Sequence, residues 1–348
     1  MNGDREGPPD PRTVYGSESS APARIHKGGS VQSIALAAGC RLIMKNAIRI
    51  WGLNSSLNWP VAAIDSAVGL MPRIGATTVT KVKLSQCNAE FISAPDTSAS
   101  RAVLYIHGGG FLVGGLNTHR ALVSRISTAR DAAVLNVGYR LLPDHSISDA
   151  VSDCLDGFRW LVHDGYPPES IVIAGDSAGG TLAFMAALHL AELGGKMPAG
   201  IATVSPLTDF CSSRRRHHRN ARRCSMFSAT SMPLFAKYAE RCYERLGLTG
   251  GYRSLTSPVD ADLSTLPPVA IHAGSDELLL HDAELMADRL GKAHVRCDLH
   301  VWEGQVHDFP LAADLLPEGR RAIDCLGEFI GEVTAPRRSA TPFSNPAA

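Results

Sequence analysis

The sequence has no excess charge of either sign, because Lys and Arg together number 34 and Asp and Glu together also number 34. This balance excludes a global electrostatic field that would recruit nucleic acid. The eight cysteines form no C-x-x-C pair, so we expect reduced thiols in a cytoplasmic protein and no disulfide framework. An apolar fraction of 45% is typical of a globular chain that buries a sizeable core.

Uninterrupted apolar runs of membrane-spanning length are also missing. The most apolar early stretch, residues 31–51, contains Arg41, Lys45 and Arg49. Their spacing of four residues predicts a helix with a basic stripe on one face. We favour a helix that packs over the core with a solvated face, and the alternative is an interfacial helix that rests on lipid. The sequence therefore leaves peripheral membrane contact open as an alternative.

Two common ligand motifs are absent. The chain has no H-x-x-H or H-E-x-x-H spacing of the kind that binds zinc, and no phosphate-binding G-x-x-x-x-G-K-[ST] loop. We therefore expect neither a metal ion nor another cofactor.

From about residue 78, strand-like and helix-like segments alternate along the chain. Alternation of this kind predicts a mostly parallel sheet of eight strands with helices on both faces. In such folds, ligands bind beyond the carboxyl ends of the strands. The predicted strands are residues 79–84, 90–93, 101–106, 132–137, 170–174, 200–204, 269–273 and 295–302, and the predicted helices are residues 116–130, 147–164, 178–193, 280–292 and 318–333.

Residues 207–265 interrupt this alternation, because they carry no strand signal. We interpret them as a helical cap insertion that roofs the site together with N-terminal helices in residues 30–77. The core then comprises residues 78–206 and 266–334, with a disordered leader at 1–29 and a flexible tail at 335–348. Within the insertion, residues 214–223 include six arginines. A solvated surface is the favoured interpretation of this arginine run, and docking to acidic lipid or protein is the alternative.

Ser177 is the candidate nucleophile. It is the centre of the G-x-S-x-G pattern at residues 175–179, between the apolar run 171–174 and a helix-like stretch. A strand that turns sharply into a helix needs small residues beside the serine and leaves its hydroxyl exposed. Asp176 and Ala178 flank the serine within this turn.

A glycine-rich loop follows another apolar strand about 70 residues upstream, at His107, Gly108, Gly109 and Gly110. Backbone N–H groups can converge in such a loop and stabilise the oxyanion of a tetrahedral intermediate. His107 is best interpreted as a residue that shapes the loop. The paired motifs predict a site for acyl transfer.

A serine nucleophile requires a base and a carboxylate that orients the base. Asp276 follows the predicted strand 269–273 and its Gly274 turn, and the adjacent Glu277 is the second candidate. His307 lies in the loop after the last predicted strand and is the candidate base.

Several motifs, in this order, resemble the hormone-sensitive-lipase family of α/β-hydrolases, and the match extends from about residue 78 to residue 332. The resemblance implies the α/β-hydrolase fold, carboxylesterase or lipase activity, and no metal or cofactor. It maps the triad onto Ser177, Asp276 and His307, and the oxyanion donors onto Gly109, Gly110 and Ala178. The motifs are residues 107–111, 139–145, 175–180, 205–209, 266–268 and 306–309.

The expected function is hydrolysis of carboxylic esters of small molecules or lipids through an acyl-enzyme. The alternatives are an amidase or carbamate hydrolase with the same triad, a catalytically silent receptor with this fold, and a membrane-docking protein. The sequence leaves the acyl length and the oligomeric state undetermined.

Overall fold

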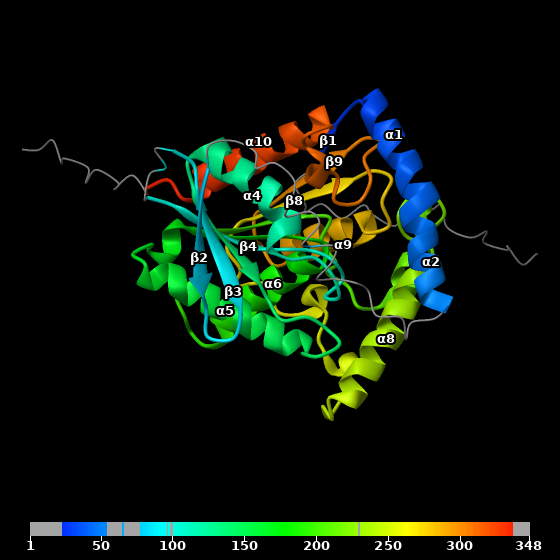
Figure 1. Ribbon diagram of the computed structural model, residues 1–348, viewed down its shortest axis with the longest axis horizontal. Helices are drawn as coiled ribbons and strands as arrows, with labels where there is room; N and C mark the ends of the chain where they lie inside the picture. Colours follow the sequence, from blue (N-terminus) through cyan, green and yellow to red (C-terminus); the bar gives the residue numbers. More distant parts are fainter. Residues whose placement is uncertain are drawn as a thin grey trace, which may run out of the picture.

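The computed structural model describes residues 23–53, 65, 77–95, 97, 100–228 and 230–336 (Figure 1). The described strands form a single sheet in the order β1-β9-β8-β7-β6-β4-β5-β3-β2. β2 and β3 pair antiparallel, as do β3 and β5, and the other neighbours pair parallel. The strands are β1 (Arg24–His26), β2 (Thr78–Lys83), β3 (Asn88–Ser93), β4 (Ala102–Ile106), β5 (Ala133–Gly138), β6 (Ile171–Asp176), β7 (Gly200–Val204), β8 (Val269–Gly274) and β9 (Cys297–Trp302).

The mostly parallel sheet confirms the predicted architecture, but the count of eight strands is wrong. β1 is the ninth strand, and it pairs with β9 at the sheet edge. It lies inside residues 1–29, so a disordered leader is incorrect for residues 24–26, whereas residues 1–22 fall outside the described residues. The predicted tail at 335–348 likewise falls outside them from residue 337 onward.

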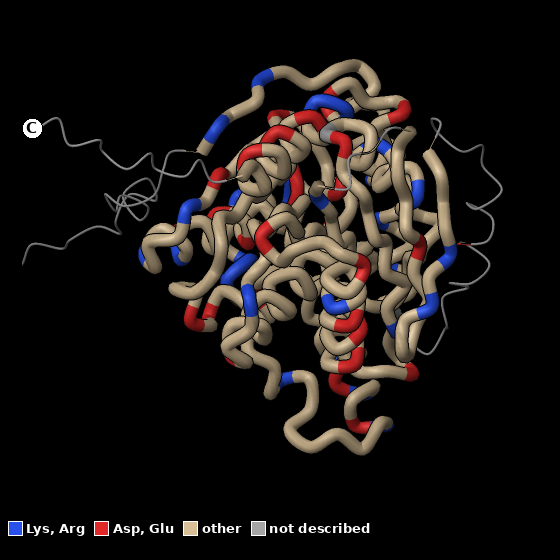
Figure 2. The backbone as a smooth tube through the Cα atoms, turned by 90° about the vertical axis from the view of Figure 1, so that its left-hand side faces the viewer, with Lys and Arg blue, Asp and Glu red and all other residues tan. Residues whose placement is uncertain are grey.

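Five of the described helices cover the two faces of the sheet. The central strands β4, β6, β7 and β8 are buried along their whole length, as expected for parallel strands between two helical layers. One face packs against α4 (Leu116–Arg130) and α10 (Pro317–Val333). The other packs against α5 (Ile147–His163), α6 (Ser177–Glu192) and α9 (Leu280–Lys292). On the side shown in Figure 2, basic and acidic residues are interspersed.

Among its described residues, the segment 207–265 contains no strand, as expected, and its described α-helices are α7 (Ser212–Arg215) and α8 (Ser231–Arg245). Near the N-terminus, α1 (Val31–Gly39), a π-helical turn (Cys40–Met44) and α2 (Lys45–Leu53) follow one another without a break. We call residues 31–53 the N-terminal helix. It runs along one edge of the molecule and contacts α8 through α2 (Figure 1). The N-terminal and insertion segments thus lie against each other, as a composite cap requires.

The basic stripe of the N-terminal helix does not form a purely solvated face. Lys45 donates to the carbonyl oxygen of Cys224 over 2.7 Å, and Arg41 donates to the carbonyl oxygen of Arg223 over 3.3 Å. Its cations therefore connect the N-terminal helix to the cap insertion. No described helix is both long enough and apolar enough to cross a bilayer.

The arginine run 214–223 is also not uniformly solvated, because Arg215 is buried against Asp282 of α9. The Asp282 carboxylate accepts two hydrogen bonds of 2.6 Å from the Arg215 guanidinium. It also accepts hydrogen bonds of 3.0 Å from the backbone N–H groups of Thr208 and Asp209. One carboxylate therefore fixes the point at which the chain leaves the core for the cap.

We expect Asp282→Ala to lower the free energy of unfolding by about 3–5 kcal/mol, because the substitution leaves a buried guanidinium without its counter-charge. Urea denaturation followed by circular dichroism measures this loss. Asp288→Ala is the matched control on the same helix, because Asp288 pairs with the exposed Lys292, and it should cost less than about 1 kcal/mol. Equal losses for the two variants would contradict the anchoring role of Asp282.

Candidate active site

Ser177 occupies the sharp turn between β6 and α6. Its φ of 49° lies in the left-handed region, which non-glycine residues rarely adopt. The neighbouring glycines are required by close packing, since a Cβ on Gly179 would collide with the carbonyl oxygen of Ile106, and a Cβ on Gly175 would lie 2.6 Å from Gly179. The turn therefore has the strained geometry of a nucleophile elbow.

His307 lies in the loop after β9 and reaches the serine. Its Nε2 lies 3.0 Å from Ser177 Oγ, and both side chains are buried. The Phe227 ring packs against the imidazole in a T-shaped arrangement, with ring centroids 4.9 Å apart. The structure thus brings together the predicted nucleophile and the predicted base, which are 130 residues apart in the chain.

The carboxylate beside His307 belongs to Glu277, and the preferred prediction of Asp276 is wrong in this respect. His307 Nδ1 lies 2.7 Å from Glu277 Oε2. The other oxygen, Glu277 Oε1, accepts hydrogen bonds from the Gly274 N–H at 2.8 Å and from Ser205 Oγ at 2.9 Å. Asp276 instead accepts a hydrogen bond from Ser275 Oγ. The turn after Gly274 directs the second of the two adjacent acids toward the histidine.

A second carboxylate lies against His307, and sequence reasoning did not single it out. Asp308 Oδ2 is 3.0 Å from His307 Nε2, the same atom that faces Ser177. Burial raises the pKa of the Asp308 carboxyl to about 7, although the charge of His307 opposes this shift. Burial alone would lower the pKa of His307, but the carboxylates of Asp308 and Glu277 outweigh it and raise that pKa well above 6.5.

The glycine-rich loop packs directly against the elbow. A Cβ on Gly108 would collide with the Asp176 carboxylate, which explains why a glycine stands there. Gly109 and Gly110 have φ values of 112° and 64°, in the region that favours glycine. Ala178 is fully buried at the first turn of α6. These residues have the backbone conformation that an oxyanion hole uses, and their role as donors remains a prediction.

Buried polar side chains around Asp176 support the glycine-rich loop. Asp176 accepts a hydrogen bond of 2.8 Å from the Tyr105 hydroxyl and lies 3.2 Å from His119 Nε2. Burial would lower the pKa of His119, yet the Asp176 carboxylate outweighs burial and raises that pKa, so the contact favours the charged form of the imidazole. His119 carries no motif that could have identified it in the sequence, because it lies within the regular helix α4.

His107 has the loop-shaping contacts that its position suggests. Its Nδ1 donates to the carbonyl oxygen of Gly108 over 2.8 Å, and its ring stacks on Tyr139 with centroids 4.2 Å apart. Burial lowers the pKa of His107 to about 4, so its ring is neutral at neutral pH. The Tyr139 hydroxyl donates to the carbonyl oxygen of His107 over 2.9 Å.

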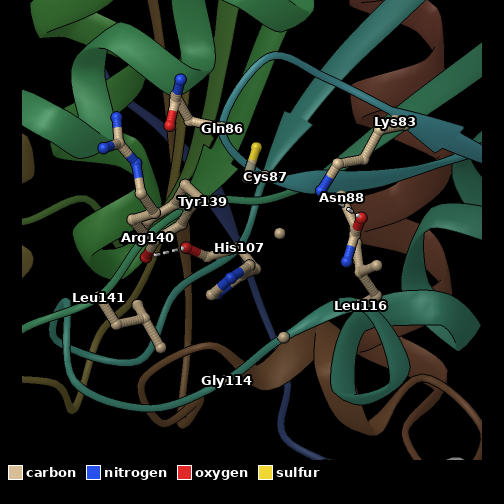
Figure 3. Close-up of a pocket in the computed structure, with 12 residues that line it drawn as sticks. Lys83, Gln86, Cys87, Asn88, His107, Gly114, Leu116, Tyr139, Arg140 and Leu141 are labelled. Atoms are coloured by element: carbon tan, nitrogen blue, oxygen red, sulfur yellow. Dashed lines mark hydrogen bonds between the residues drawn. The ribbon is translucent and has the colours of Figure 1, made fainter. Parts of the chain in front are cut away.

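A cavity of about 340 Å³ lies beside His107 of this loop (Figure 3). His107 lines it, and Lys83 and Arg140 border it from opposite sides. The described residues that line this cavity include neither Ser177 nor His307, so it is separate from the reacting atoms.

One group of potential metal ligands exists among the described residues, formed by His26, His300 and Cys325. The two imidazoles hydrogen-bond to each other through His26 Nε2 and His300 Nδ1, 2.9 Å apart, with ring planes inclined by 15°. This pair connects β1 to β9.

Comparisons with known proteins agree with this geometry. A family model described as alpha/beta hydrolase fold matches residues 103–311. Esterase LipU of Mycobacterium tuberculosis is 40% identical over 280 residues, which cover 79% of this chain and 94% of LipU. Carboxylesterase/phospholipase LipF of the same organism is 36% identical over 320 residues, which cover 90% of this chain and 86% of LipF.

Solved structures show the same relationship. A crystal structure of an esterase from the bacterial hormone-sensitive lipase family is 30% identical, with a TM-score of 0.75 over 88% of this chain and 100% of that chain. The crystal structure of EstE5 soaked with p-nitrophenyl butyrate has the same identity, TM-score and coverage. The chain therefore belongs to the bacterial hormone-sensitive-lipase family of α/β-hydrolases.

Proposed function

We propose that the chain is a serine carboxylesterase in which Ser177, His307 and Glu277 act as nucleophile, base and orienting acid. The observation that carries the proposal is the unbroken series from Ser177 Oγ to His307 Nε2 at 3.0 Å, and from His307 Nδ1 to Glu277 Oε2 at 2.7 Å. Relatives named esterase and carboxylesterase support the same activity.

The first half-reaction follows from these contacts. His307 Nε2 accepts the proton of Ser177 as its Oγ attacks the ester carbonyl carbon, and Glu277 stabilises the resulting imidazolium from the Nδ1 side. We assign the backbone N–H groups of Gly109, Gly110 and Ala178 to the developing oxyanion. The intermediate collapses when the alkoxide leaves with the proton from His307, and Ser177 remains acylated.

Water completes the cycle by the same route in reverse roles. His307 takes a proton from the water as its oxygen attacks the acyl carbonyl, and then returns that proton to Ser177 as the carboxylic acid leaves. No step requires a metal ion or an organic cofactor.

Acyl esters of short to medium length, from small molecules or lipids, are the substrates that we propose. The p-nitrophenyl butyrate soaked into EstE5 and the phospholipase in the name of LipF suggest this range. The test is the rate of hydrolysis of p-nitrophenyl esters from acetate to palmitate, beside the matched p-nitroanilides. Ester turnover well above anilide turnover supports the proposal. Faster anilide turnover would favour the amidase alternative, and no turnover of either would leave only the receptor or docking alternatives.

The pH dependence of kcat/KM should reveal the effect of Asp308, the second carboxylate beside His307. Because His307 must be neutral to act as a base, kcat/KM rises with pH through the pKa of His307. The charge of Asp308 favours the imidazolium, so Asp308→Asn should lower that pKa and move the rising limb toward acid by about one pH unit or more. Rate profiles from about pH 5 to about pH 9 measure the shift.

Asp276→Asn serves as the control for this profile, because the Asp276 carboxylate accepts its hydrogen bond from Ser275 Oγ, whereas His307 Nδ1 bonds to Glu277. The Asp276→Asn substitution should leave the rising limb of the kcat/KM profile at the same pH. An unchanged limb in Asp308→Asn would show that Asp308 does not control the protonation of His307.

A further inference from the structure

The N-terminal helix presents an apolar face to the surroundings. At the helical repeat, its most exposed large apolar side chains gather on one side of the helix, which we call the outer face. Each is at least 62% exposed, and together they account for five of the twelve most prominent exposed hydrophobic side chains among the described residues. They are Val31, Ile34, Leu42, Ile43 and Ile50.

The opposite side of the same helix accounts for its packing. Cys40, Leu36 and Ala37 contact the cluster around Val306 and Phe309, which flank the loop that holds His307. Ser30 caps the helix and hydrogen-bonds to Glu318 through its backbone N–H at 2.8 Å and its hydroxyl at 3.0 Å. At the far end, Trp51 packs edge-on against Tyr238 of α8, with centroids 5.2 Å apart. The helix is thus held in place without using its outer face.

The charged residues of the N-terminal helix itself all have one sign. Residues 31–53 contain Arg41, Lys45 and Arg49, but no Asp or Glu. The hydrogen bonds from Arg41 to the Arg223 carbonyl oxygen and from Lys45 to the Cys224 carbonyl oxygen bring the end of the arginine run beside the helix. Arg222 and Arg223 are exposed there. An apolar helix face with a cationic border matches the chemistry of an anionic lipid surface, which accepts apolar side chains between its acyl chains and arginines among its phosphates.

We propose that the outer face of the N-terminal helix, bordered by Arg222 and Arg223, docks the enzyme onto an anionic bilayer surface. Docking there places the cap, which α2 contacts through α8, next to lipid esters. The helix lies in the plane of the surface and does not cross it. Docking would bring the proposed esterase to lipid esters in the bilayer as substrates. Only this use rests on the proposed function, because docking itself does not require esterase activity.

The experiment is co-sedimentation of the full chain with vesicles of phosphatidylcholine alone and of an equimolar mixture of phosphatidylcholine and phosphatidylglycerol. We expect binding to the mixed vesicles that weakens with added salt. The double variant Leu42→Glu, Ile43→Glu should weaken binding by about a hundredfold or more, since it removes two apolar insertions and adds two repelled charges. Arg222→Glu with Arg223→Glu should weaken it by about tenfold or more.

Matched controls use residues remote from the outer face. Leu193 is 61% exposed at the end of α6, and Arg159 is exposed on α5, which lies away from the N-terminal helix in Figure 1. Leu193→Glu and Arg159→Glu should bind the mixed vesicles as tightly as the wild type does.

Three results would overturn the proposal. The first is absence of binding to the mixed vesicles, and the second is equal binding by the wild type and the Leu42→Glu, Ile43→Glu variant. The third is a dimer in sedimentation velocity that the same substitutions dissociate, because the outer face would then bind a second copy of the chain. Hydrolysis of p-nitrophenyl butyrate in solution separates the two proposals, because the docking variants should retain wild-type turnover of this soluble ester. A wild type that binds vesicles without hydrolysing any ester would refute the proposed function and leave docking intact.

Discussion

Ser177→Ala is expected to lower kcat for ester hydrolysis about 10⁶-fold. Alanine removes only the hydroxyl that forms the acyl-enzyme, and the left-handed φ of 49° at this position is no harder for alanine than for serine. The contacts of His307 with Glu277 do not involve the serine. Loss of activity would therefore report loss of the nucleophile and not collapse of the site.

The measurement is steady-state turnover of p-nitrophenyl butyrate, joined to mass spectrometry of protein treated with a phosphonate ester. The wild type should gain one phosphonyl group on Ser177, and the variant should gain none. Residual activity should remain about 10³–10⁴-fold above the uncatalysed rate, because the proposed oxyanion donors are unchanged in the variant. A variant that kept most of its turnover would show that another residue carries the acyl group.

Much of this architecture could be predicted because its signals are local. The central strands are short apolar runs bounded by turns, and parallel strands buried on both faces require that pattern. The elbow at Ser177 was recognisable because only small residues fit beside it, and His307 because it follows the last strand of the sheet. β1 gave no comparable signal. It spans three residues with little apolar character, and only its pairing with β9 makes it a strand.

Contacts between distant segments could not be predicted. The sequence predicts that Arg215 is solvated like the other arginines of its run, because its buried partner Asp282 is 67 residues away in the chain. The network of Asp176 and His119 depends on how α4 crosses the sheet, which no local motif encodes. Asp308 is next to the predicted base, yet its contact with His307 Nε2 depends on a backbone φ of 52° that no sequence pattern announces.

The choice between Asp276 and Glu277 shows most clearly what cannot be predicted from the sequence alone. Both acids follow Gly274, and either one satisfies the rule that the acid comes after this strand. The side chain that reaches His307 is decided by the turn, in which the Gly274 N–H and Ser205 Oγ hold Glu277 Oε1. Ser205 lies 72 residues upstream of Glu277. The two candidates for the orienting acid are adjacent in the chain, and only tertiary contacts show which of them reaches His307.

This assignment leads to the second large effect, since Glu277→Gln should lower kcat about 10⁴-fold whereas Asp276→Asn should lower it by less than about tenfold. The amide in Glu277→Gln keeps the shape of the side chain but removes the charge that stabilises the imidazolium. It can also present an N–H group to Nδ1, which would favour the wrong tautomer of His307. Asp276 is the matched control, because it is the adjacent acid on the same turn.

Steady-state kinetics at a pH where His307 is neutral in the wild type distinguishes the two acids. Glu277→Asp provides a further check, because it retains the charge but shortens the side chain by one methylene, and its turnover should lie between those of the wild type and Glu277→Gln. A large loss in Asp276→Asn with a small loss in Glu277→Gln would reverse the assignment. Since Glu277 also accepts hydrogen bonds from Gly274 and Ser205, unfolding of Glu277→Gln should be followed in parallel. A variant that is folded but 10⁴-fold slower would separate the role of the carboxylate charge in catalysis from its role in holding the turn.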